Sequence, residues 1–136
     1  MTAKAYDFAR AEAYFRERLE FTTGTHELNT LITGPGKGED YQVVDVRFPD
    51  DFARERVPGA INLPMPKWEN RRYLEANLRK DATIYLYCYT PTCHLAAQAA
   101  SKLAAAGYKA VEVEGGWKSW IEGGYEVERP SAVKSA

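Results

Sequence analysis

Two cysteines are the residues of this chain best suited to covalent chemistry. Cys88 and Cys93 are its only cysteines, and they lie at the two ends of one short segment, CYTPTC. A cysteine thiolate is a strong nucleophile, and a pair of thiols can also be oxidised to a disulfide. Two cysteines are too few to staple a small secreted domain. Their number and spacing therefore point to chemistry at a single site.

The segments around the cysteines predict where that site lies. Short runs rich in β-branched and aromatic residues predict four strands, at residues 41–46, 60–63, 83–88 and 110–113. Helix-compatible stretches lie between them, at residues 50–56, 67–79 and 92–106. Strands that alternate with helices in this way are typical of an α/β fold in which helices cover both faces of a parallel sheet.

Cys88 ends the third predicted strand, and its loop leads into the longest of these predicted helices. In parallel sheets, ligands collect at the carboxyl ends of strands, and the N-terminus of a following helix attracts anions. We therefore expect backbone N–H groups around the Cys88 sulfur to favour its thiolate. The alternative is that Cys88 is a small hydrophobic residue at the end of a buried strand.

The N-terminal region predicts two further helices. Apolar residues recur at helical spacing over residues 8–21, and a shorter helix starts with Thr25 as its N-cap and ends at the glycine-rich run 34–38. The aromatic face of the first helix would let it either cover the sheet or pair two copies of the chain. We expect three parts: a helical extension over residues 1–33, a domain over residues 34–128 and a frayed tail over residues 129–136.

Three segments resemble the rhodanese family of sulfurtransferases, and they occur in the family's order. The runs VVDVR at 43–47 and VPGAINLP at 57–64 resemble the family's VDVR and IPGAINLP, and the strand 84–88 is followed by a six-residue loop. The third segment, with VEGGW at 113–117 and then Trp120, resembles the family's last motif. By these motifs the chain is similar to single-domain rhodaneses of a bacterial type with an N-terminal helical extension.

The resemblance implies a rhodanese-like α/β fold and a catalytic Cys88 that alternates between thiol and persulfide. Sulfane sulfur would pass from a thiosulfate-type or persulfide-type donor, either a small molecule or a protein, to a thiol or cyanide acceptor. No cofactor and no metal are implied. Asp45 and Arg47 end a neighbouring strand, where Asp45 could accept hydrogen bonds from the loop. Five residues would offer main-chain N–H groups to the sulfur: Tyr89, Thr90, Thr92, Cys93 and His94.

The cysteine loop departs from the family at two positions. The family commonly has Arg where this chain has Cys93, and often Ser or Thr where it has His94. Thiosulfate is a dianion, so the loss of a charge-assisted hydrogen bond worth about 1.5–3 kcal/mol should weaken its use. Arg71 and Arg72 can come near the mouth of the site in this topology and replace the cation, or they form a solvated helix face.

Cys93 and His94 each allow two interpretations. Cys93 could form a disulfide with a modified Cys88, or it could simply pack inward. His94 could tune the thiolate, or it could be an ordinary exposed histidine. A zinc site would need these residues together with the remote His26, and that spacing fits no common zinc pattern.

Two other classes of function compete with sulfur transfer. A phosphatase or an arsenate reductase would need an arginine in the loop to hold a tetrahedral oxyanion, and residues 89–94 contain none. A non-enzymatic module that senses redox state or docks partners could also use Cys88 and Cys93. The retained cysteine argues against docking alone and leaves redox sensing open.

Composition and charge narrow the partners. The net charge is −1, so no overall field attracts nucleic acid or anionic lipid. No run of residues approaches the roughly 18 apolar residues of a membrane span, and the first residues do not resemble a secretory signal. We therefore expect a cytoplasmic protein with no nucleic-acid or membrane partner, which could form a homodimer through its first helix.

Overall fold

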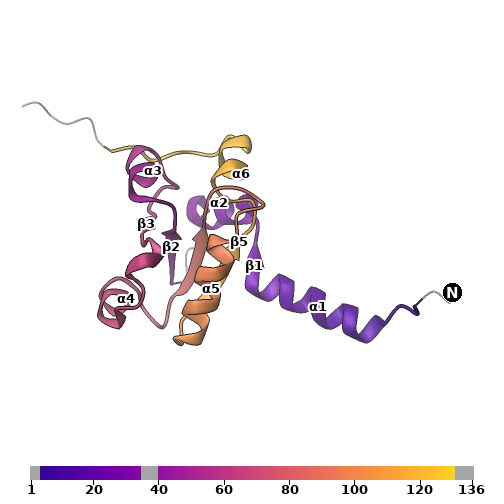
Figure 1. The fold of residues 1–136 in the computed structure, drawn as a ribbon. Coiled ribbons are helices and arrows are strands. Elements are labelled where there is room, and N and C mark those ends of the chain that lie inside the picture. Colours follow the sequence, from indigo (N-terminus) through magenta and orange to yellow (C-terminus); the bar gives the residue numbers. More distant parts are fainter. Residues whose placement is uncertain (1–3, 35–39, 131–136) are drawn as a thin grey trace, which may run out of the picture.

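The computed structural model describes residues 4–34 and 40–130, and its centre is a parallel β-sheet (Figure 1). The strand order is β1-β5-β4-β2-β3, and every neighbouring pair is parallel. The predicted α/β fold, with a central parallel sheet, is thereby confirmed. The strands are β1 (Thr22–Thr23), β2 (Tyr41–Asp45), β3 (Ile61–Asn62), β4 (Thr83–Tyr87) and β5 (Lys109–Val113).

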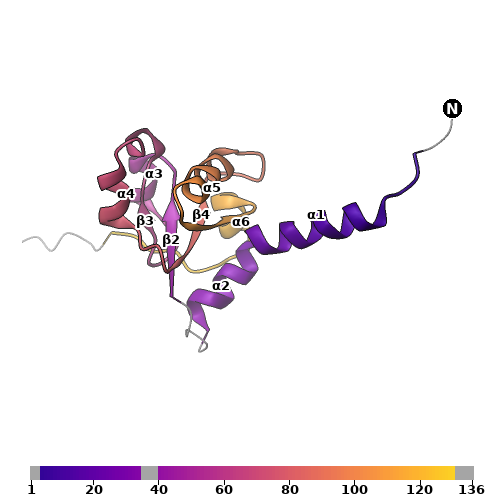
Figure 2. The same cartoon turned by 90° about the horizontal axis from the view of Figure 1, so that it is seen from below.

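Helices connect the strands and cover both faces of the sheet, with α5 and α2 on opposite sides (Figure 2). They are α1 (Phe8–Phe21), α2 (Thr25–Thr33), α3 (Pro49–Arg54), α4 (Arg71–Asn77), α5 (Leu95–Ala105) and α6 (Gly116–Glu122), with a 3₁₀ turn at Met65–Lys67. Each connection between successive strands thus contains a helix, because parallel strands are joined by crossover connections of this kind.

Two apolar clusters hold these layers together because side chains alternate along the strands. One lies between the sheet and the helices α4 and α5, and it includes Ile84, Leu86 and Cys88. The other lies against α2 and α6, and it includes Leu28, Tyr87 and Trp120. Cys88 therefore follows the alternation of β4 and turns its side chain toward α5.

The sheet also places Cys88 beside the end of β2. Asp45 is paired with Tyr87 across β2 and β4, and the Val46 N–H donates to the Tyr87 carbonyl at 3.1 Å. Parallel strands end at one edge of the sheet, so the segment after β2 and the cysteine loop lie side by side. Figure 1 shows both segments at the same end of the sheet.

Several predicted helix boundaries differ from the structure, and α3 ends at Arg54 where the pattern predicted residue 56. Gly24, not Thr25, is the N-cap of α2, and it offers no side-chain hydrogen bond. The stretch 67–79 is divided, because the Asn70 side chain caps a separate α4. The helix predicted from residue 92 starts only at Leu95, since the preceding residues are in a turn in which the Cys93 N–H donates to the Thr90 carbonyl.

Helix α1 projects away from the sheet (Figures 1 and 2). It has the predicted bounds, its N-cap is the Asp7 side chain, and none of its residues is buried. Its C-terminal part is attached to the domain by Arg18, whose Nη2 lies 3.4 Å from Oε1 of Glu114. The alternative in which this helix covers a face of the sheet is therefore wrong.

The predicted division into extension, domain and tail stays a prediction. Leu28 of α2, within the predicted extension, is buried in the cluster that contains Trp120. Glu128 is tied to the domain, because its carboxylate accepts from Arg56 at 2.6 Å and from the Gly59 N–H at 3.0 Å. The glycine-rich run beyond Gly34 and most of the predicted tail lie outside the described residues.

The described helices also bear on membrane insertion. Within residues 4–34 and 40–130, none of them is both long and apolar enough to cross a bilayer.

Candidate functional site: a cysteine pair at the carboxyl edge of the sheet

Cys88 follows β4 directly, and only 3% of its surface is exposed. Its side chain belongs to the apolar cluster under α5. The backbone N–H groups of Tyr89 and Ala96 form hydrogen bonds with its sulfur. The first of these groups comes from the loop and the second from the first turn of α5. Cys88 is thus a buried thiol whose polar contacts are main-chain donors, which suits a sulfur that acquires negative charge.

Cys93 lies just before α5 and is half-buried against the same apolar cluster. Its thiol and the thiol of Cys88 shift each other's pKa values. The Cys88 sulfur also donates to the Cys93 carbonyl at 3.5 Å. The N–H groups of Tyr89, Thr90 and Leu95 face the Cys93 sulfur. The loop therefore folds the two thiols onto each other.

The two thiols differ in how readily they ionise. Burial raises the pKa of Cys88 to about 11, and the hydrogen bond with Cys93 adds to this rise. Burial also acts to raise the pKa of Cys93, but the hydrogen bond from Cys88 and the surrounding N–H groups outweigh it, so that pKa is lowered. The predicted thiolate character of Cys88 stays a prediction, because burial opposes it while the N–H groups of Ala96 and Tyr89 favour it.

The five predicted N–H donors have different positions. Tyr89 and Thr90 do point N–H groups at the sulfurs, while the Cys93 N–H is taken by the Thr90 carbonyl. Thr92 has its hydroxyl 3.2 Å from that of Thr90. His94 is the N-cap of α5 and is exposed. Sequence reasoning missed the N–H groups of Leu95 and Ala96, because it started the helix three residues too early.

Helix α6 donates hydrogen bonds to the backbone of the cysteine loop. The Trp117 N–H donates to the Cys88 carbonyl and the Lys118 N–H to the Tyr89 carbonyl, both at 2.8 Å. Gly116 makes this approach possible, since a Cβ there would lie 2.7 Å from the Cys88 oxygen. Its φ of +60° also favours glycine. The two glycines before Trp117 were the sequence signal for this contact.

Tyr89 ties the loop to α3. Its hydroxyl donates to Asp51 at 2.5 Å and accepts from the Phe48 N–H at 2.9 Å. The hydrogen bond from Tyr89 lowers the pKa of Asp51. Nothing in the spacing of the sequence indicated that Asp51 would contact the cysteine loop. The loop is thus anchored by its side chain at α3 and by its backbone at α6.

Asp45 and Arg47 support the same edge as a buried ion pair. Arg47 Nη2 donates to Asp45 at 2.8 Å and to the Glu55 carbonyl at 2.6 Å. The Tyr87 hydroxyl also donates to Asp45, with Oδ2 as the acceptor, at 2.6 Å. Asp45 was expected to accept hydrogen bonds from the cysteine loop, and in the structure it is used by these neighbours instead. Their positions make both residues part of the framework beneath the loop.

Arg71 does not supply the missing cation. It lines a small pocket with Lys80, Ala106 and Tyr108, residues at the C-terminal end of α5. The cysteine loop is at the other end of that helix, which at 1.5 Å per residue is about 16 Å long. Arg72 follows it in the same exposed first turn of α4. The alternative in which Arg71 reaches the mouth of the site is therefore wrong, and for Arg72 it stays a prediction.

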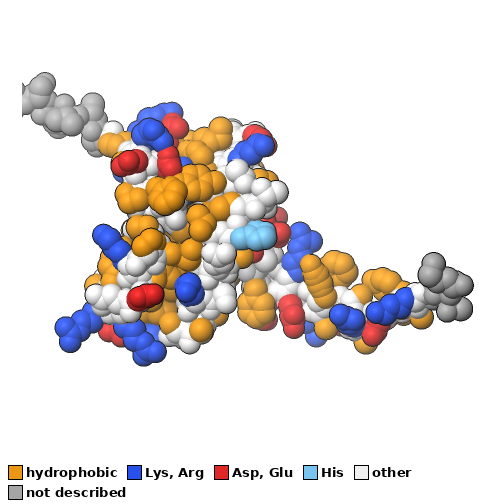
Figure 3. Space-filling model, viewed as in Figure 1, with side chains coloured by type: hydrophobic (Ala, Val, Ile, Leu, Met, Phe, Trp, Pro, Cys, Tyr) orange, Lys and Arg blue, Asp and Glu red, His pale blue; other side chains and the backbone are white. Residues whose placement is uncertain are grey.

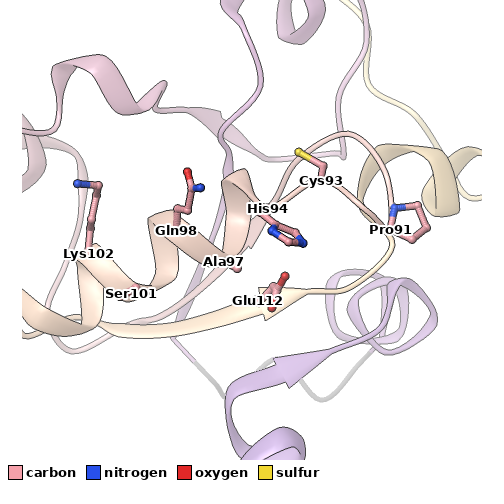
Figure 4. Close-up of a pocket in the computed structure, with 8 residues that line it drawn as sticks. All are labelled: Pro91, Cys93, His94, Ala97, Gln98, Ser101, Lys102 and Glu112. Atoms are coloured by element: carbon pink, nitrogen blue, oxygen red, sulfur yellow. The ribbon is translucent and has the colours of Figure 1, made fainter.

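An open groove of about 680 Å³ runs along α5 beside the cysteine loop. Figure 4 shows the His94 ring near the carboxylate of Glu112, and the Gln98 and Lys102 side chains along the helix. Burial and the neighbouring Glu114 raise the pKa of Glu112. The Cys93 sulfur points away from His94 and Glu112, so the groove borders the outer side of the loop (Figure 4).

Within the described residues, no three His, Cys, Asp or Glu side chains lie close enough together to hold a metal ion.

The parallel sheet with a cysteine loop at its carboxyl edge defines an α/β protein with a candidate thiol site. Comparison with known proteins identifies its family. Residues 27–123 match the model of the rhodanese-like domain. The chain therefore belongs to the rhodanese-like domain family, as its motifs indicated.

Individual relatives support the same assignment. The chain is 37% identical over 75 residues to the thiosulfate sulfurtransferase PspE of Escherichia coli (strain K12), covering 55% of this chain and 69% of that one. It is 31% identical over 80 residues to the uncharacterized protein YqhL of Bacillus subtilis (strain 168), covering 58% of this chain but only 60% of that relative. The crystal structure of the BH2092 protein from Bacillus halodurans superposes with a TM-score of 0.81 at 30% identity, covering 90% of this chain and 87% of that one.

Proposed function

We propose that this protein is a sulfurtransferase that carries sulfane sulfur as a persulfide on Cys88. The observation that carries the proposal is the environment of the Cys88 sulfur, which is buried at the carboxyl edge of the sheet and faces the N–H groups of Tyr89 and Ala96. These donors would stabilise the negative charge of a persulfide without a cationic side chain. Membership of the rhodanese-like family, with a thiosulfate sulfurtransferase among the relatives, supports the same chemistry.

The resting thiols suggest how Cys88 is activated. Because the pKa of Cys93 is lowered, part of it is thiolate, and this thiolate can take the proton of Cys88 as a donor binds. The Cys88 sulfur then attacks the outer sulfur of the donor, and the bond between the two donor sulfurs breaks. Thiosulfate leaves as sulfite, and a persulfide donor leaves as a thiolate. In both cases Cys88 keeps one additional sulfur atom.

An acceptor completes the transfer. A thiolate or cyanide attacks the outer sulfur of the Cys88 persulfide, and the electron pair of the broken bond returns to Cys88. The acceptor leaves as a persulfide or as thiocyanate. Because no arginine lies in the loop, we expect a persulfide donor to be used more readily than the thiosulfate dianion. The partners we propose are therefore thiol compounds or thiol-bearing proteins, in the reducing cytoplasm where such thiols persist.

Intact mass spectrometry tests the nucleophile. The reduced protein is mixed with thiosulfate or with a low-molecular-weight persulfide, and the bound sulfur is then removed with cyanide. We expect Cys88→Ser to take up no sulfur, while the matched variant Cys93→Ser, five residues away in the same loop, still takes it up. If Cys88→Ser takes up sulfur and Cys93→Ser does not, the nucleophile is Cys93 and the assignment is wrong.

A further inference from the structure

The contact between the two thiols has a use beyond activation. The Cys88 Sγ donates to the Cys93 carbonyl at 3.5 Å, and both cysteines are free thiols. Helix α6 fixes the backbone of Cys88, because the Trp117 N–H donates to the Cys88 carbonyl. Cys93 precedes the first residue of α5, so no helical hydrogen bond fixes its position. The backbone of Cys88 is therefore fixed by α6, while Cys93 lies outside the helix and beside the Cys88 sulfur.

We propose that Cys93 is a resolving thiol, which converts a persulfide on Cys88 into a Cys88–Cys93 disulfide and releases hydrogen sulfide. This inference rests on the proposed function, because it starts from the Cys88 persulfide. Cys93 attacks the inner sulfur of the persulfide, which is the Cys88 Sγ itself. The bond between that sulfur and the outer sulfur breaks, and the outer sulfur leaves with the electron pair as hydrosulfide.

The atoms and electrons of this step balance without an oxidant. The persulfide sulfur is reduced to hydrosulfide while the two cysteines are oxidised to the disulfide. The proton of the Cys93 thiol ends on the released sulfide. A second turnover then requires an external dithiol or another thiol reductant, which returns both cysteines to thiols. The protein would thus couple consumption of sulfane sulfur to oxidation of a thiol reductant.

The arrangement of the sulfurs decides which product forms. An external acceptor must reach the outer sulfur, whereas the inner sulfur, Cys88 Sγ, already contacts Cys93 through its carbonyl. An intramolecular attack of this kind competes well because its partner is held at high effective concentration. The lowered pKa of Cys93 increases the fraction of attacking thiolate. Cys93 therefore sets the division between transfer to an acceptor and release as sulfide.

The experiment compares wild type with Cys93→Ala, and Ser101→Ala serves as a control on the neighbouring face of α5. Each protein is loaded with a low-molecular-weight persulfide, separated from excess donor and left without acceptor. Released sulfide and intact mass are followed together. Wild type and Ser101→Ala should each release one sulfide per chain and end two hydrogens lighter than the reduced protein. Cys93→Ala should keep its additional sulfur at least tenfold longer.

The outcomes separate this inference from the proposed function. If Cys93→Ala takes up sulfur and wild type keeps its persulfide equally long, the resolving role is overturned while sulfur transfer stands. If no protein takes up sulfur, the proposed function fails and the inference fails with it. Oxidation of the reduced protein with diamide gives a second readout. It should join Cys88 and Cys93 within one chain, and disulfides formed only between chains would overturn the inference.

A second inference rests on α1 and on no residue of the cysteine loop. Phe8, Phe15 and Leu19 lie at helical spacing on one face of α1 and are 78%, 52% and 82% exposed. Figure 3 shows apolar side chains on the projecting helix, interleaved with charged ones. The stripe continues into a groove of about 530 Å³ at the base of the helix, lined by Phe15, Leu19 and Thr22. Such a surface is typical of an interface.

We infer that α1 packs antiparallel against α1 of a second copy of the chain. Glu12 and Arg16 flank the stripe on one side and are paired with each other within the helix. An antiparallel arrangement centred near Tyr14 places Glu12 of each copy beside Arg16 of the other. A parallel arrangement would instead set each of these charges beside its own duplicate. The charges therefore favour the antiparallel pair, and the groove adds to the area that a stable dimer must bury.

Sedimentation equilibrium over a range of concentrations tests this pairing. Wild type should be a dimer, and Phe15→Glu should be a monomer, while Ala13→Glu on the opposite face of α1 should stay a dimer. Glu12→Arg and Arg16→Glu should each weaken the dimer at least tenfold, and the double variant should restore it. A wild-type monomer at every concentration, or a dimer that survives Phe15→Glu, would overturn the inference.

Discussion

Asp45 and Arg47 form a fully buried ion pair at the end of β2, with Arg47 Nη2 2.8 Å from Asp45 Oδ2. The pair links three parts of the site, because the guanidinium also lies 4.5 Å from the centre of the Trp117 ring and the carboxylate accepts from Tyr87. Trp117 in turn holds the Cys88 carbonyl. The buried ion pair thus helps to position Trp117, and Trp117 positions the backbone of Cys88.

Removal of Asp45 should strongly destabilise the protein. In Asp45→Ala, the Arg47 charge stays buried without its partner, so the free energy of unfolding should fall by about 3–5 kcal/mol. Urea denaturation followed by circular dichroism measures the change. The matched control is Glu122→Ala, which breaks an exposed pair with Lys118 and should cost less than about 0.5 kcal/mol. Equal losses in the two variants would contradict the structural role of the buried pair.

Gly116→Ala should slow sulfur uptake by Cys88. The new Cβ would lie 2.7 Å from the Cys88 carbonyl oxygen, so the loop must shift. We expect uptake to slow at least tenfold and stability to fall by about 1–3 kcal/mol. Gly59→Ala is the control, because Gly59 also has a positive φ but nothing lies within 4 Å of its added Cβ. That variant should lose stability and keep its uptake rate, and a similar slowing in both would argue against a specific contact.

Tyr89→Phe should raise the pKa of Asp51. The hydrogen bond from the Tyr89 hydroxyl is the largest of the contributions that lower this pKa, ahead of those from Arg54. A titration of the Asp51 carboxyl followed by NMR measures the shift, and Arg54→Ala, which removes a hydrogen bond and a charge from the same carboxyl, should also raise this pKa. If Tyr89→Phe leaves the titration unchanged, the loop is not anchored to α3 through this hydroxyl.

The pH dependence of alkylation should distinguish the two thiols. In wild type, Cys93 should react with iodoacetamide at lower pH than Cys88, whose pKa is raised to about 11. In Cys93→Ala, Cys88 should titrate at lower pH than in wild type, because the variant lacks the hydrogen bond and charge of Cys93. Burial still keeps that pKa above the ordinary value of a thiol. Peptide mass spectrometry follows each site, and a Cys88 midpoint that is unaffected by Cys93→Ala would refute the coupling.

The same shift predicts how stability changes with pH. The folded protein holds the Cys88 proton more tightly than the unfolded chain does. The resulting contribution to the free energy of unfolding is complete below about pH 9 and is lost as the pH rises to about 11. The difference in unfolding free energy between wild type and Cys88→Ala isolates it, since Tyr87 is present in both. The free energy of unfolding of wild type, relative to that of Cys88→Ala, should therefore fall as the pH rises from about 9 to about 11. A constant difference from pH 8 to pH 11 would contradict the raised pKa.

Much of the architecture could be predicted from local pattern. The alternation of short β-branched runs with helical stretches predicted the parallel sheet, and the end of β4 placed Cys88 at its carboxyl edge. The amphipathic spacing of residues 8–21 predicted α1 with its observed bounds. These features depend on periodicity within one segment, which the order of residues contains in full.

The chemistry of the site depended on contacts between segments that are distant in the chain. Which thiol keeps its proton follows from the burial of Cys88 and from its contact with Cys93, and neither is visible in a spacing of five residues. Arg71 was placed near the site by topology alone, but the length of α5 separates it from the loop. Sequence determined which groups were available, while the tertiary structure decided their protonation and their partners, because desolvation and hydrogen bonding act through space and not along the chain.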